Sequence, residues 1–223
     1  MDRKRTDAAA LVLGTLATLT TMAMHPRGGS GEALREGESL SRVGVAAVAS
    51  HSIAIAGIPL LLMGLWGLSR RLGWDSAPVR LAFAAYGLAS AAVLNAAVMS
   101  GFVATGTAMS IRSDSPEGAK TVAAYFAYTF VLNQSFAKVY VVASSAAIVL
   151  WSLRAIRLGS GWRGAGIFGV AAGTAASALV ITRTLPLNVH GFGVIVLLQS
   201  AWTLWMAALL SRGDPTALTL QAP

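Results

Sequence analysis

The chain of 223 residues contains no cysteine. This absence excludes disulfide bonds, iron–sulfur clusters and zinc sites with thiolate ligands, so any bound metal would need histidine or oxygen ligands. Charged residues are also scarce, at 12% of the chain. A soluble domain normally carries about twice that share. The low charge, together with a hydrophobic share of 55%, indicates that lipid is the solvent of this protein.

Acidic residues are the scarcer charge, with nine Asp and Glu against seventeen Lys and Arg. All nine lie outside the long apolar segments: Asp2, Asp7, Glu32, Glu36, Glu38, Asp75, Asp114, Glu117 and Asp214. Proton-coupled carriers and pumps usually keep a carboxylate within the membrane as the titrating group. The sequence therefore disfavours a transporter of that type.

The hydrophobic residues are gathered in six segments, each close to the length of about 20 helical residues that crosses a hydrocarbon core of about 30 Å. These continuous runs of Ala, Leu and Val lack the alternation of β-barrel strands. The sequence therefore predicts an all-α, polytopic membrane helical bundle that occupies residues 1–223 as a single domain. The predicted spans are residues 8–24, 45–68, 81–105, 134–153, 164–181 and 189–210.

Two of these spans allow a second interpretation. The first follows a basic start, as a cleaved signal peptide would, although the residues around Met24 make a poor cleavage site. The fourth belongs to a stretch without a helix breaker from Thr121 to Leu153, which would be about 50 Å long as one helix. We therefore expect a break near Asn133, with residues 121–133 at the membrane interface.

The basic residues favour one orientation. With the N-terminus inside, ten Lys and Arg flank the inner ends of the spans and six lie in the outer loops, which predicts both termini in the cytoplasm of a cell with the protein in its inner (plasma) membrane. The net charge of +8 is thus explained by anchoring to lipid headgroups, and no nucleic-acid partner is expected. Small residues such as Gly166, Gly169 and Gly173 predict close helix packing.

The only three histidines are His25, His51 and His190, and all fall in the outer half under this topology. Neutral imidazole suits Zn, Cu or haem iron, and three nitrogens with an open position is a catalytic metal pattern. The sequence thus offers these three residues as metal ligands. No short metal-binding spacing supports the pattern, so ordinary polar roles at helix ends stay open.

A second polar group lies on the predicted fourth span. Asn133, Gln134, Lys138 and Tyr140 share adjoining strips of one helix, and Arg183 would add a cation at the same outer mouth. These five residues are the predicted substrate-binding set, although Lys138 could equally extend to the headgroups. The amides Asn95 and Gln199 are expected to bridge helices.

The polar residues are therefore concentrated toward one face, which favours a histidine-containing pocket near the outer surface. We expect either a metal- or haem-assisted membrane enzyme acting on a lipophilic or small substrate, or binding without chemistry. The alternatives are a small-molecule or lipid carrier or exporter, with a homo-oligomer as one form it could take, and a non-catalytic membrane subunit.

Overall fold

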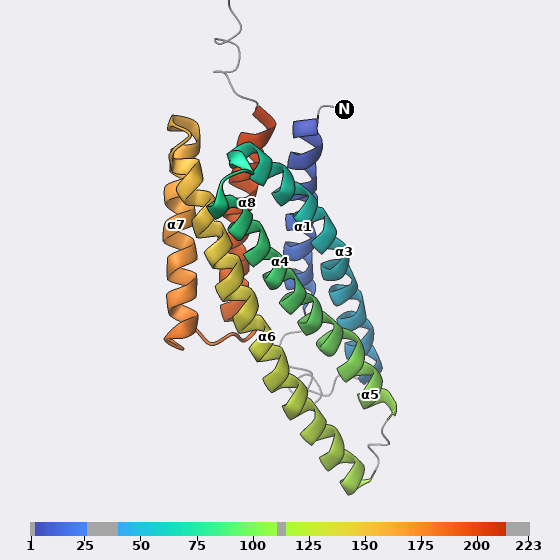
Figure 1. Cartoon of the computed structure of the whole chain (residues 1–223). Helices are drawn as coiled ribbons and strands as arrows, with labels where there is room; N and C mark the ends of the chain where they lie inside the picture. Colours follow the sequence, from blue (N-terminus) through green and yellow to red (C-terminus); the bar gives the residue numbers. More distant parts are fainter. Residues whose placement is uncertain (1–2, 26–39, 111–114, 213–223) are drawn as a thin grey trace, which may run out of the picture.

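A computed structural model describes residues 3–25, 40–110 and 115–212. Every regular element within these residues is helical: α1 (Arg3–Met24), α3 (Leu40–Gly73), α4 (Ala77–Val98), η1 (Met99–Val103), α5 (Ala104–Ser110), α6 (Pro116–Ile156), α7 (Ser160–Ile181) and α8 (Val189–Arg212) (Figure 1). Six stretches are long and apolar enough to cross a bilayer, counting α4 to α5 as one. The prediction of an all-helical bundle with six candidate spans is confirmed, whereas the orientation of the termini stays a prediction.

The six long helices form a closed ring. Each contacts the next one along the chain, and the last, α8, returns to contact the first, α1. Successive helices run in opposite directions, with α6 and α7 on one side of the bundle and α1 and α3 on the other (Figure 1). This up-and-down order leaves a central axis onto which α1, α3, α4, α6 and α8 direct side chains.

Glycines set the distance between α1 and α3. A Cβ atom added at Gly14 would collide with Leu61, and one added at Gly64 would collide with the backbone of Leu11. Gly57 meets α1 in the same way. Membrane helices gain little from hydrophobic association in lipid, so close backbone approach at small residues is a main source of their packing energy. These glycines therefore hold α1 and α3 together as an antiparallel pair.

The predicted close packing around Gly166, Gly169 and Gly173 is confirmed. All three lie on α7 where a side chain would collide with α6, at Ile156, Ser152 and the carbonyl oxygen of Ser145 respectively.

The third span contains an irregular turn that its sequence did not reveal. The α-helical hydrogen-bond pattern of α4 widens at Met99–Val103 into a π-helical turn, after which α5 continues. Gly101 lies in this turn, packed against the ring of His51 from α3. Such π turns insert one extra residue into a helix and are frequent at functional sites.

The expected break in the fourth span is wrong. Residues 116–156 form one uninterrupted helix, α6, which begins at the cap Ser115 and Pro116 and is about 60 Å long at 1.5 Å per residue. Its first half extends beyond the other helices of the bundle (Figure 1). Tyr128, Phe130 and Val131 are more than half exposed there. Continuous i to i+4 hydrogen bonding satisfies the backbone along the whole length, so nothing in this segment forces the helix to end.

The two ends of the bundle differ in character. We call the end where His25 and His51 lie the histidine end, and the opposite end, where α1 begins and α3 finishes, the Asp7–Arg70 end. Toward the latter, a set of large apolar side chains, each at most 3% exposed, fills the axis. This apolar layer consists of Leu11, Leu65, Leu68, Leu72, Trp151, Trp202, Met206 and Leu210.

We expect Gly64→Ala to lower the stability of the bundle by about 1–3 kcal/mol, because its methyl group would force α1 away from α3. The matched control is Gly87→Ala on α4, where a Cβ atom meets nothing within 4 Å. That change should leave the stability equal or slightly higher, since alanine is the better helix former. Thermal unfolding in detergent would compare the two, and equal midpoints would contradict the role given to Gly64.

Candidate functional site

Two of the three histidines meet at the histidine end. The rings of His25, just after the last residue of α1, and His51 on α3 pack edge to face with centroids 5.4 Å apart. His51 is only 8% exposed. Its Nδ1 lies 2.7 Å from the carbonyl oxygen of Ala47, and because a carbonyl can only accept, Nδ1 carries the hydrogen. The neutral ring therefore has Nε2 as its basic nitrogen, the one that can take a proton or another partner.

The surroundings of His51 fix its position from three helices. Gly101 of the π turn leaves the space that the imidazole fills. On α1, the hydroxyl of Thr21 donates to the carbonyl oxygen of Ser50, next to His51. The hydroxyl of Ser50 lies 3.4 Å from Nδ1. A buried imidazole with a fixed tautomer and a fixed ring is the arrangement found where histidine acts as a ligand or a proton acceptor.

The predicted three-histidine metal site is not supported. His190 lies exposed in the first turn of α8. Among the described residues, no group of three His, Asp or Glu side chains is close enough to hold a metal ion. The physical reason is orientation: His190 starts a helix whose buried face is formed by other positions, Gly191 and Ile195 among them.

A hydrogen-bonded cluster lies deeper in the bundle and connects α6 to α8. The hydroxyl of Tyr140 donates to Oε1 of Gln199 at 3.0 Å. The amide nitrogen of Gln199 donates in turn to the hydroxyls of Ser144 and Ser145, at 2.8 and 3.3 Å. The prediction that Gln199 bridges helices is confirmed. It is wrong for Asn95, which is exposed and donates to Ala91 of its own helix.

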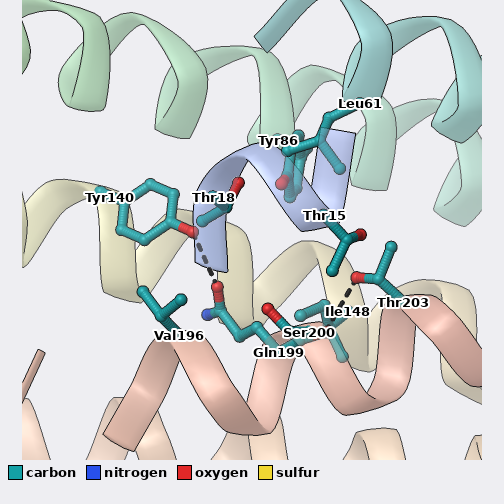
Figure 2. Close-up of a pocket in the computed structure, with 10 residues that line it drawn as sticks. All are labelled: Thr15, Thr18, Leu61, Tyr86, Tyr140, Ile148, Val196, Gln199, Ser200 and Thr203. Atoms are coloured by element: carbon teal, nitrogen blue, oxygen red, sulfur yellow. Dashed lines mark hydrogen bonds between the residues drawn. The ribbon is translucent and has the colours of Figure 1, made fainter. Parts of the chain in front are cut away.

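Beside this cluster is a small cavity, which we call the central cavity (Figure 2). Its volume is about 20 Å³, enough for water but far below the 300 Å³ or more of pockets for drug-sized ligands. Five of the six long helices contribute to its wall. The lining residues are Thr15, Thr18, Leu61, Tyr86, Tyr140, Ile148, Val196, Gln199, Ser200 and Thr203, of which seven are polar.

The five residues predicted to bind substrate have different environments. Lys138 and Arg183 are exposed, and Asn133 is half-buried. Gln134 donates to the carbonyl oxygen of Leu187 at 2.9 Å, so its role is to tie the α7–α8 connection to α6. Only Tyr140 lines the central cavity. Residues that lie on adjoining strips of α6 thus have different neighbours in the bundle.

The sequence also missed two features. Asp7, expected just outside the first span, is buried within α1 and forms an ion pair with Arg70 of α3, 2.8 Å between Oδ2 and Nη2. Gly67 leaves room for this carboxylate. The second feature is a polar strip on α1, where Thr15, Thr18, Thr21 and His25 recur every three or four residues. Helical spacing could have revealed this strip, because such residues share one face.

Comparison with known proteins gives no match. No protein family, no curated protein and no solved structure matches this chain. Any function must therefore be argued from the residues themselves.

We expect Gln199→Leu to lower the stability by about 1–2 kcal/mol, because it removes the hydrogen-bond partner of the buried Tyr140 hydroxyl and of two serines. The matched change is Asn95→Leu, an exposed amide bonded within its own helix. It should cost much less, and it could even stabilise a lipid-facing surface. Reversible unfolding in mixed micelles would measure both, and an equal loss from the two changes would show that the α6–α8 cluster contributes nothing specific.

Proposed function

We propose that this protein is a proton-linked membrane carrier that takes up and releases protons at the His25–His51 pair. The observation that carries the proposal is the contact of the two rings, with Nδ1 of His51 fixed on Ala47. Histidine is the side chain whose unperturbed titration lies nearest to neutral pH. An ionisable group inside a candidate span is expensive to keep there and is by default a candidate for function.

The pair is suited to hold one proton rather than two. A single positive ring is stabilised by a neutral ring beside it, whereas two positive rings 5.4 Å apart would repel each other in a medium of low dielectric constant. Taking up a second proton would therefore drive the end of α1 away from α3. The neighbouring π turn at Gly101 is a place where the third span can adapt to such a movement.

This proposal replaces the metal- or haem-dependent enzyme as the leading interpretation. The metal version of the enzyme interpretation used three imidazoles at one point, and the described residues hold no such group of three. The sequence disfavoured carriers that titrate a carboxylate within the membrane, so this carrier interpretation requires another titrating group, together with a polar interior. His51 supplies the first, and the hydroxyls around the central cavity supply the second. With the orientation favoured by the basic residues, the histidine end would face the outside of an inner (plasma) membrane.

The decisive experiment is proton uptake by purified protein in liposomes that contain a pH-sensitive dye, driven by a potassium diffusion potential. We expect His51→Gln to reduce the protein-dependent uptake about tenfold or more, because glutamine keeps polarity but cannot be protonated. The matched change is His190→Gln, a histidine outside the pair, which should leave uptake unchanged. Uptake that is absent from the unaltered protein, or equal in the two variants, would overturn the proposal.

A second change tests the position of His51 without removing it. Gly101→Ala places a methyl group against the imidazole, so we expect it to displace the ring and to reduce uptake as His51→Gln does. Gly106→Ala, one turn beyond in α5, meets nothing within 4 Å and serves as the control. If both glycine variants transport like the unaltered protein, the geometry of the pair is not required.

One observation favours a second candidate, a non-catalytic membrane subunit. The central cavity admits nothing larger than water, and the glycine contacts hold the helices close together. A protein built only to associate with partners in the membrane would need no larger space. It would show no proton uptake, and all three histidines could be replaced without loss of assembly.

A further inference from the structure

The central cavity is the strongest remaining candidate for a binding site, because it lies on the axis of the ring and is lined mainly by polar groups (Figure 2). We infer that it is a site for ordered water inside the bundle. The size fits, because a cavity of about 10–15 Å³ can hold a water molecule and this one has a volume of about 20 Å³. A water molecule also needs two to four polar partners, and seven of the lining residues carry a polar side chain.

Two hydroxyl groups in the wall need such a partner. Tyr86 on α4 and Ser200 on α8 are largely buried, at 8% and 6% exposed. Among the described residues, neither hydroxyl takes part in a hydrogen bond with the protein. A buried hydroxyl without a hydrogen bond costs about 1–3 kcal/mol. Both residues line the central cavity, so water placed there is the nearest source of a partner for either hydroxyl.

The other polar groups of the wall are already in use, which limits where the water can bind. Thr15, Thr18 and Thr203 donate to carbonyl oxygens of their own helices. Their hydroxyl oxygens still have a lone pair to accept a hydrogen bond. Tyr86 and Ser200 therefore supply the free donors, and the threonines supply acceptors.

Polar residues of α1 continue from the cavity toward the histidine end, whereas large apolar residues lie toward the opposite end. Toward the histidine end, α1 presents Thr18, Thr21 and His25 in succession, and the distance from Thr15 to His25 is about 15 Å along the helix. Toward the Asp7–Arg70 end, each helix that lines the cavity and carries part of the apolar layer places large apolar side chains beyond it. In each case a lining residue is succeeded, in the direction of that end, by a residue of the apolar layer. The pairs are Thr15 and Leu11 on α1, Leu61 and Leu65 on α3, Ile148 and Trp151 on α6, and Thr203 and Met206 on α8.

The inference rests on the lining groups and not on proton exchange at the histidines, so it stands or falls separately from the proposed function. If both hold, the water molecule extends the polar strip of α1 into the middle of the bundle. The apolar layer then separates that water from the opposite end, as in a half-channel.

Water-edited solid-state NMR on the full-length protein in lipid bilayers tests the site directly. We expect magnetisation to pass rapidly from water to the side chains of Gln199 and Ser200. The indole of Trp151, fully buried and bonded to Ser69 within the apolar layer, is the internal control and should receive none at short mixing times. If Gln199 and Ser200 receive no more magnetisation from water than Trp151 does, the inference is overturned.

A filling variant gives a second, independent readout. Ser200→Val replaces a hydroxyl with two methyl groups facing the cavity, so the water signal at Gln199 should be lost. Ser211→Val, an exposed serine on the same helix, should leave that signal unchanged. Persistence of the water signal in a folded Ser200→Val protein would place the water elsewhere and contradict the inference. If the cavity proves hydrated but the protein shows no proton uptake, the water site stands and only the proposed function is contradicted.

Discussion

The close contact between α1 and α3 is the constraint on which the other features of this structure depend. Gly14, Gly57 and Gly64 allow the two backbones to approach along their length. Because the helices are antiparallel, that single contact determines what meets at each end. It brings Asp7 to Arg70 at one end and His25 to His51 at the other. Neither pair could form if the helices were separated by the width of a leucine side chain.

Inside the bundle, the hydrogen-bonded polar groups lie between two apolar clusters, one toward each end. The hydroxyl strip of α1, the Tyr140–Gln199 cluster and the central cavity lie on the histidine side of the apolar layer. In a low-dielectric medium, the position of polar groups decides where a proton or a water molecule can be held, since such groups stabilise a proton or a water molecule only over short distances. A protein that merely associates with other helices has no need for two imidazoles in contact inside a span, and for that reason we favour proton-linked transport.

The π turn at Gly101 and the buried ion pair are opposite solutions to holding a polar group in a membrane helix. The turn changes the backbone so that an imidazole fits against it. The ion pair leaves both helices regular and neutralises Asp7 with Arg70, while Gly67 supplies the space. The π turn leaves His51 able to change its charge, whereas in the ion pair the charge of Asp7 is compensated by that of Arg70. This difference is why our proposal assigns function to the histidine end and a structural role to the Asp7–Arg70 end.

The sequence by itself determined the helical class, the six candidate spans and the close packing at the small residues of α7, because hydrophobic length and residue size are local properties of a chain. It also marked His25 and His51 as candidates. Only the tertiary structure decided that His190 is exposed and not part of the His25–His51 pair, that α6 continues without a break and that Asp7 is buried. The reason is that helix rotation selects the face that each residue presents, and rotation is set by contacts between segments far apart in the chain. Tyr86 and Ser200 show this most clearly, since nothing near either residue in the sequence reveals that they share one cavity.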